Sequence, residues 1–143
     1  MRISVVIQGS PQSQSCATAF EYTKAIIESE NEVYRIFFHQ DAALAGNSLN
    51  EAPSDEPRIG ELWSELAAKH KLEMIVCSTS AARRGILDKA EAKRRGTKSN
   101  LLPNFFLGGL GLLMDAIFES DKTITFGEWW KKSFLSFQVV YPT

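Results

Sequence analysis

The chain has 143 residues, of which 44% are hydrophobic and 23% are charged, and its formal net charge is −1. This size and composition are typical of one globular domain, and the small net charge offers no electrostatic reason to expect nucleic acid or a membrane as partner. No run approaches the roughly 20 apolar residues that cross a bilayer, and the N-terminus lacks the apolar core of a signal peptide. The two cysteines, Cys16 and Cys77, fit no disulfide framework and no zinc spacing, which favours a reducing, cytoplasmic location.

Short β-branched runs and amphipathic runs alternate through the first half of the chain. In the first amphipathic run Phe20 and Ile27 lie seven residues apart, and in the second Ile59, Trp63 and Leu66 follow helical spacing. The expected elements are, in order, a strand over 3–7, a helix over 16–29, a strand over 33–38, a loop over 39–54 and a helix capped by Ser54 or Asp55.

The same alternation continues in the second half. The expected elements are a strand over 72–77, a short helical segment from Ser78 to Gly85, a charged helix over 88–95, a strand over 104–107, a helix over 108–119 and a strand over 122–126. Strands joined by helices through short links form right-handed βαβ units. The sequence therefore predicts a three-layer α/β/α sandwich with a mostly parallel five-stranded sheet.

The last strand is followed by an unusually apolar segment. We assign residues 1–126 to one domain and 127–143 to a C-terminal extension of the same single-domain chain. Three interpretations of the extension stay open: an interface, an added layer over its own sheet, or a cloning remnant. Its large apolar side chains are Trp129, Trp130, Phe134, Leu135, Phe137, Val139, Val140 and Tyr141.

Cys77 is the strongest candidate for chemistry. In open parallel sheets, functional groups gather beyond the carboxyl ends of the strands, and Cys77 ends an expected strand there. The helix expected to begin at Ser78 would present free N–H groups and a positive dipole end, both of which favour the nucleophilic thiolate. The alternative is that Cys77 is a small buried residue at a strand end.

The other candidates are weaker. His39 follows the second strand on the same edge, where it is either a proton donor near Cys77 or a packing residue. His70 is expected to be solvated at a helix end, and Cys16 to be ancillary. The chain has no phosphate-binding glycine motif and no Ser/His/Asp arrangement, so we expect no cofactor and no metal.

Basic residues gather between Arg83 and Lys98. They form either a solvated face or a docking surface for an acidic partner or RNA. The members of this basic segment are Arg83, Arg84, Lys89, Lys93, Arg94, Arg95 and Lys98.

The segment around Cys77, MIVCSTSAARRGILDKAEAKRRG, resembles the DsrE family of sulfur carriers, particularly its TusD-like members. There a cysteine follows an apolar strand, and an Ala-rich segment leads to Arg-Arg-Gly and an acidic-Ala helix. The resemblance covers roughly residues 1–126. Further similar pieces, in order, are Ala19-Phe20, the Phe-Phe that ends 33–38, Pro53-Ser54-Asp55-Glu56 and Leu107-Gly108-Gly109-Leu110-Gly111.

The resemblance implies the same α/β sandwich and a sulfurtransferase activity in which Cys77 carries sulfur as a persulfide. It implies a heterohexamer with B-type and C-type homologous subunits. In that assembly a TusA-like protein would donate the sulfur and a TusE-like protein would accept it. The sulfur would serve synthesis of 2-thiouridine at the tRNA wobble position, and the protein itself would not contact tRNA directly. Two alternatives stay open: a DsrE-type relay in sulfur oxidation, and a non-catalytic structural subunit. The chain departs from the family pattern at His39, where an aromatic residue is usual, and in its extension.

Overall fold

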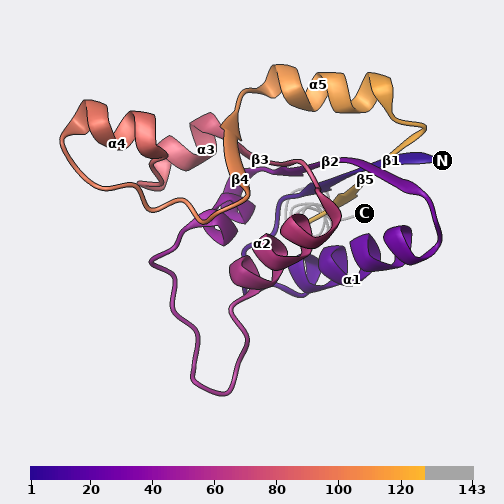
Figure 1. The fold of residues 1–143 in the computed structure, drawn as a ribbon, viewed down its shortest axis with the longest axis horizontal. Coiled ribbons are helices and arrows are strands. Elements are labelled where there is room, and N and C mark those ends of the chain that lie inside the picture. Colours follow the sequence, from indigo (N-terminus) through magenta and orange to yellow (C-terminus); the bar gives the residue numbers. More distant parts are fainter. Residues whose placement is uncertain (128–143) are drawn as a thin grey trace, which may run out of the picture.

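The computed structural model describes residues 1–127 and contains one five-stranded sheet. The strand order is β4-β3-β2-β1-β5, and every neighbouring pair is parallel, so the predicted α/β class is confirmed (Figure 1). The strands are β1 (Arg2–Ile7), β2 (Glu32–Phe38), β3 (Met74–Cys77), β4 (Phe105–Gly108) and β5 (Lys122–Phe126). The helices are α1 (Gln14–Glu28), η1 (Gln40–Gly46), α2 (Ile59–His70), α3 (Ser78–Arg83), α4 (Lys89–Arg95) and α5 (Leu110–Glu119).

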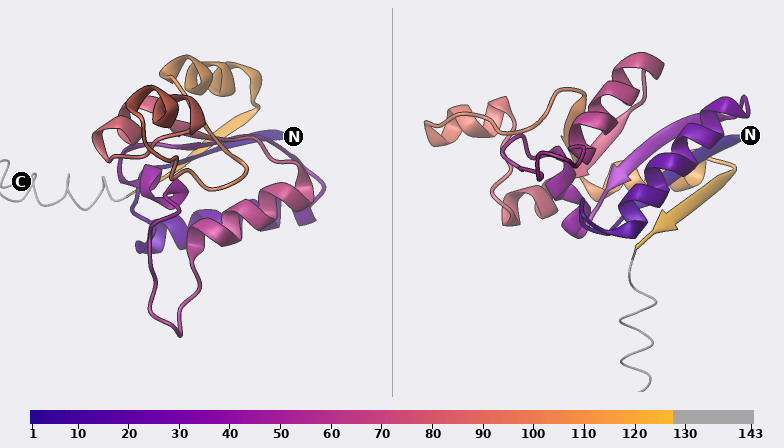
Figure 2. Two further views of the ribbon diagram at one scale, coloured as in Figure 1. Left: turned by 60° about the vertical axis from the view of Figure 1, so that its left-hand side comes forward. Right: turned by 90° about the horizontal axis from the view of Figure 1, so that it is seen from below.

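The helices form a layer on each side of the sheet. Helices α1 and α2 cover one face and α5 crosses the other, while α3 and α4 project from the β4 end (Figures 1 and 2). The larger core, between the sheet and α1 and α2, includes Trp63, whose ring meets those of Phe20 and Phe38 edge to face. The smaller core, beneath α5, consists of Val6, Phe37, Ile75 and Cys77, with Leu112 and Leu113 packed against it.

The predicted cap of α2 is wrong. Neither Ser54 nor Asp55 caps that helix, which begins at Ile59 after Arg58. Pro57 accounts for the difference, because a proline disfavours the helical conformation in the residue before it. The helix therefore begins after Pro57, at Ile59.

The predicted loop over 39–54 contains the 3-10 helix η1. Its Ala42, Ala43, Ala45 and Gly46 are buried against the larger core. Small side chains allow this segment to approach the sheet closely. Helices are predicted from a periodic alternation of apolar and polar residues, and this alanine-rich segment shows none.

The predicted α4 is confirmed, with Asp88 accepting a hydrogen bond from the Glu91 N–H and Gly96 ending the helix at φ +69°.

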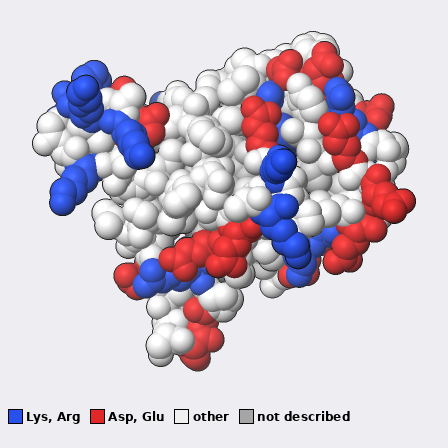
Figure 3. Space-filling model, in the orientation of Figure 1, with Lys and Arg blue, Asp and Glu red and all other residues white. Residues whose placement is uncertain are grey.

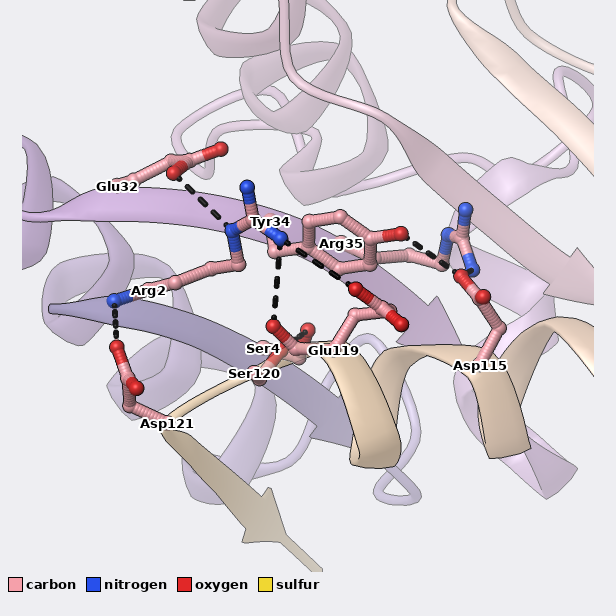
Figure 4. A network of polar contacts seen from close by, with 9 residues as sticks. All are labelled: Arg2, Ser4, Glu32, Tyr34, Arg35, Asp115, Glu119, Ser120 and Asp121. Atoms are coloured by element: carbon pink, nitrogen blue, oxygen red, sulfur yellow. Dashed lines mark hydrogen bonds and ion pairs between the residues drawn. The ribbon is translucent and has the colours of Figure 1, made fainter.

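Helix α5 is held to the sheet by a nearly buried arginine. The Arg35 guanidinium donates to a Glu73 carboxylate oxygen at 2.9 Å, and to an Asp115 carboxylate oxygen and the Leu112 carbonyl oxygen, both at 2.8 Å. Tyr34 also donates to Asp115, at 2.8 Å (Figure 4). These hydrogen bonds, first from Tyr34 and then from Arg35, lower the pKa of Asp115.

The predicted domain boundary lies at the limit of the described residues. Apart from Gly127, the predicted extension over 127–143 falls outside them, so its assignment stays a prediction. Among residues 1–127, no helix is both long enough and apolar enough to cross a membrane.

Candidate functional site

Cys77 lies at the junction of β3 and α3. It is the last residue of β3, with φ −56° and ψ 122°, and the next residue opens the helix. Side chains alternate along a strand, so Cys77 and Ile75 share the face that α5 covers. Leu112 and Leu113 pack against this cluster, and Cys77 is only 3% exposed. The structure therefore places the thiol at the strand end that the sequence predicted, and it adds an apolar cover.

The neighbouring strands end level with Cys77. On one side it pairs with Gly108 of β4, and on the other Val76 pairs with Phe38 of β2. A side chain at position 108 would not fit, because its Cβ would lie 2.5 Å from Leu112 Cδ1 and 2.7 Å from Ile75 Cγ2. Gly108 thus allows the residue that covers Cys77 to approach the sheet.

His39 is one residue beyond the last paired residue of β2. Its backbone remains extended, and its N–H donates to the Ile7 carbonyl oxygen at 2.8 Å. The His39 ring lies 6.1 Å from that of Phe37, which belongs to the same cluster as Cys77. Burial, and then the positive charge of Arg84, lower the pKa of His39, which favours its neutral form at neutral pH.

Polar contacts join the start of η1 to α3. The Gln40 N–H donates to Ser80 Oγ at 3.0 Å, and Arg84 donates to an Asp41 carboxylate oxygen at 2.7 Å and to the Ser80 carbonyl oxygen at 3.1 Å. The sequence did not reveal the two contacts between η1 and the α3 segment, because Gln40 and Ser80 are 40 positions apart and Asp41 and Arg84 are 43 apart. These contacts hold the segment that follows His39 against the segment that follows Cys77.

A hollow of about 570 Å³ opens between α3 and α4, beside the residue that follows Cys77. Lys and Arg side chains gather over α4 at the left of Figure 3. Glu91 partly neutralises them, pairing with Arg94 at 2.7 Å. A smaller hollow of about 150 Å³ borders the loop over 47–58, and Cys77 is among the lining residues of neither hollow. The larger hollow is lined by Ser78, Thr79, Ala82, Arg83, Ile86, Leu87, Asp88, Glu91, Arg94, Arg95 and Leu107.

The DsrE/DsrF-like family matches residues 1–126 of the chain. The chain belongs to this family. It is 36% identical over 130 residues to the sulfurtransferase DsrE of Allochromatium vinosum, an alignment that covers 90% of this chain and all of that protein. This DsrE relative supports sulfur transfer as the activity at the level of the family.

A solved structure shares the DsrE fold. The ychN protein of E. coli superposes with a TM-score of 0.72 at 24% identity, covering 88% of this chain and 99% of that one. At this identity the likeness concerns the fold alone. The family match ends at residue 126, so it does not extend over the apolar extension.

Cys16 and His70 lie on the opposite side of the sheet from Cys77 in this DsrE-family chain. Cys16 is fully buried in the larger core, where burial raises the pKa of its thiol to about 11. The buried indole N–H of Trp63 is near enough to oppose this rise slightly, yet it makes no hydrogen bond within the described residues. His70 is exposed at the end of α2, as predicted. No group of three or more His, Cys, Asp or Glu in residues 1–127 is arranged to hold a metal ion.

Proposed function

We propose that this DsrE-family protein is a sulfur-relay subunit that accepts sulfane sulfur as a persulfide on Cys77 and passes it to an acceptor protein. The observation that carries the proposal is the position of Cys77 at the carboxyl end of β3 and the start of α3, in a family to which a named sulfurtransferase belongs. Cys16 is a poor alternative, since it lies inside the larger core and its raised pKa makes the thiolate scarce at neutral pH.

The chemistry consists of two exchanges at sulfur. The Cys77 thiolate attacks the outer sulfur of a donor persulfide, a new S–S bond forms, and the donor leaves as a thiolate with the electron pair of the broken S–S bond. The acceptor thiolate then attacks the outer sulfur on Cys77 and releases the Cys77 thiolate. Neither step changes the total oxidation level, and both depend on thiolate fraction and access, as in thiol–disulfide exchange.

The covering of Cys77 by Leu112 and Leu113 supports a carrier role. A persulfide held under apolar side chains is shielded from small thiols in solution, which would otherwise remove its outer sulfur. Delivery would then require a partner that reaches the thiol. The hollow between α3 and α4 begins at Ser78 and presents Arg83, Arg94 and Arg95, which suits an acceptor with acidic residues near its cysteine.

We further propose that the protein works in an assembly, with B-type and C-type homologous subunits in a heterohexamer, a TusA-like donor and a TusE-like acceptor. An exposed apolar surface supports assembly, since such patches mark interfaces. We call it the α5 face; it consists of Phe106, Leu110, Met114, Ile117 and Phe118. The proposed setting is the cytoplasm, where free thiols remain reduced.

Two pathways are compatible with this chemistry: wobble 2-thiouridine synthesis and sulfur oxidation. The resemblance to TusD-like proteins supports 2-thiouridine synthesis. The relative named DsrE supports sulfur oxidation equally. Quantifying 2-thiouridine in tRNA from a deletion strain decides between them. Loss of the modification supports the tRNA pathway, and an unchanged level favours sulfur oxidation.

The direct test is intact-mass analysis after incubation with a cysteine desulfurase, cysteine and a TusA-like donor. We expect a gain of one sulfur atom that maps to Cys77 and persists in Cys16→Ala. A gain that survives in Cys77→Ala, or that maps only to Cys16, would refute the proposal. Activity in vivo that persists in Cys77→Ser would instead favour a non-catalytic structural subunit.

A further inference from the structure

Strand register brings His39 next to Cys77. The paired residues of β2 and β3 end with Phe38 opposite Val76, so the next residues on the two strands are His39 and Cys77. His39 has extended backbone angles, Cys77 is the last residue of β3, and the His39 N–H continues the ladder to β1. Adjacent strands lie about 4.8 Å apart, which brings the two residues within side-chain reach.

Side-chain parity puts both groups on the same face of the sheet. Phe37 and Ile75 both belong to the cluster beneath α5, and His39 and Cys77 each follow one of them by two residues. The 6.1 Å separation of the Phe37 and His39 rings agrees with this assignment. The imidazole and the thiol therefore project from adjacent strands on the same face of the sheet.

The surroundings of His39 favour a neutral imidazole. Arg84, at the end of α3, lowers the pKa of His39, and Arg84 is itself paired with Asp41 of η1 at 2.7 Å. Among residues 1–127, the apolar residues of α5 that pack against the neighbouring cluster are Leu112 and Leu113, which carry no charge. A neutral imidazole has one nitrogen free to accept a proton.

We propose that His39 is the proton-transfer partner of Cys77. His39 accepts the Cys77 proton as the thiolate forms, the thiolate attacks the outer sulfur of the donor persulfide, and the donor leaves as a thiolate. The imidazolium of His39 then returns the proton to that leaving thiolate, so that protons and electrons balance without another reactant. This assignment rests on the proposed function and adds to it the residue that moves the proton.

The test measures alkylation of Cys77 by iodoacetamide against pH, with the labelled site identified by peptide mapping. In the wild-type protein the rate should rise through the titration of His39, below the ordinary histidine value of 6.5. In His39→Gln that rise should disappear and the rate near neutral pH should fall about tenfold or more, the lower range for a general base. His70→Gln, at an exposed histidine on the opposite layer, is the matched control and should behave as wild type.

A second measurement does not depend on the folding of the variant. In the NMR titration of wild-type protein, the His39 ring should show a second step when Cys77 ionises, and Cys77→Ser should lack it. An unchanged alkylation profile in folded His39→Gln, or a second step that persists in Cys77→Ser, overturns the assignment.

The two proposals fail separately, because alkylation requires no sulfur donor. If Cys77 never acquires sulfur while alkylation depends on His39, the proposed function is wrong and the pairing stands. If persulfide forms on Cys77 at the same rate in His39→Gln as in wild type, the pairing is wrong and the function stands.

Discussion

The two cysteines show how position determines the chemistry of one residue type. Both thiols are buried, but Cys77 ends a strand at the functional edge of the sheet, whereas Cys16 lies inside the larger core near Trp63. At Cys16 desolvation dominates and raises the pKa to about 11. A thiol in that position contributes packing rather than reactivity.

Cys16 should make the protein less stable as the pH rises above its unperturbed value of 9.0. The unfolded chain loses this proton there, while the folded protein keeps it up to about 11, so the free energy of unfolding falls within that window. The contribution is at most about 1.4 kcal/mol per pH unit. Urea unfolding at a series of alkaline pH values should give a shallower decline for Cys16→Ala than for wild type. Equal slopes would contradict the assignment of the titrating group.

At the scale of elements, the position of α5 determines whether Cys77 is covered. The helix lies over the smaller core, and its middle is fixed by the hydrogen bonds of Arg35 to Asp115 and to the Leu112 carbonyl oxygen. Leu112 itself packs against the cluster that contains Cys77. The same turn of α5 therefore carries both the anchor and the cover.

Arg35→Ala should destabilise the protein by about 2 kcal/mol, a value expected for losing hydrogen bonds to charged groups and discounted because the partner carboxylates are half exposed. Chemical denaturation measures it. The control is Arg58→Ala, whose ion pairs with Glu51 and Glu61 are more exposed and should be worth less than about 1 kcal/mol. Cys77 in Arg35→Ala should also react faster with iodoacetamide, because its cover is loosened. If Arg35→Ala and Arg58→Ala lowered the free energy of unfolding equally, Arg35 would not be the anchor of α5.

At the scale of the whole molecule, the α5 face is the feature that a monomer does not explain. Four of its residues lie along one side of α5, and Phe106 adds an exposed ring from the edge strand β4. Phe106 pairs with Ile75, so its side chain is on the same side of the sheet as α5. The apolar surface thus extends from the helix to the edge of the sheet.

Replacing Met114 and Phe118 by Lys should weaken assembly without unfolding the protein, because both side chains are exposed, at 49% and 76%. Light scattering after size-exclusion chromatography should show a lower mass than for wild type, with an unchanged unfolding midpoint. Leu49→Lys is the matched control, since Leu49 is 73% exposed on a loop away from α5. The role of the α5 face in assembly would be contradicted if Leu49→Lys lowered the mass as much as the Met114 and Phe118 replacements do. It would also be contradicted if neither variant changed the mass.

Local patterns predicted much of this architecture. Short apolar and β-branched runs located all five strands to within a few residues, and Asp88 and Gly96 mark the limits of α4. The start of α2 was missed because Pro57 outweighed the capping preference of Ser54 and Asp55. Helix η1 was missed because its alanines are buried by the tertiary fold and carry little local signal.

The sequence by itself determined the strands, the parallel α/β class, and a cysteine at a strand end followed by a helix, because each depends on residues close together in the chain. Strand order, the cover over Cys77 and the approach of His39 depend on residues about thirty or more positions apart. Only the packing of strands and helices brings such residues together, since the free energy that selects one pairing over another comes from burial across the whole sheet. Tertiary structure therefore decided the surroundings of the thiol, while the local sequence decided its position.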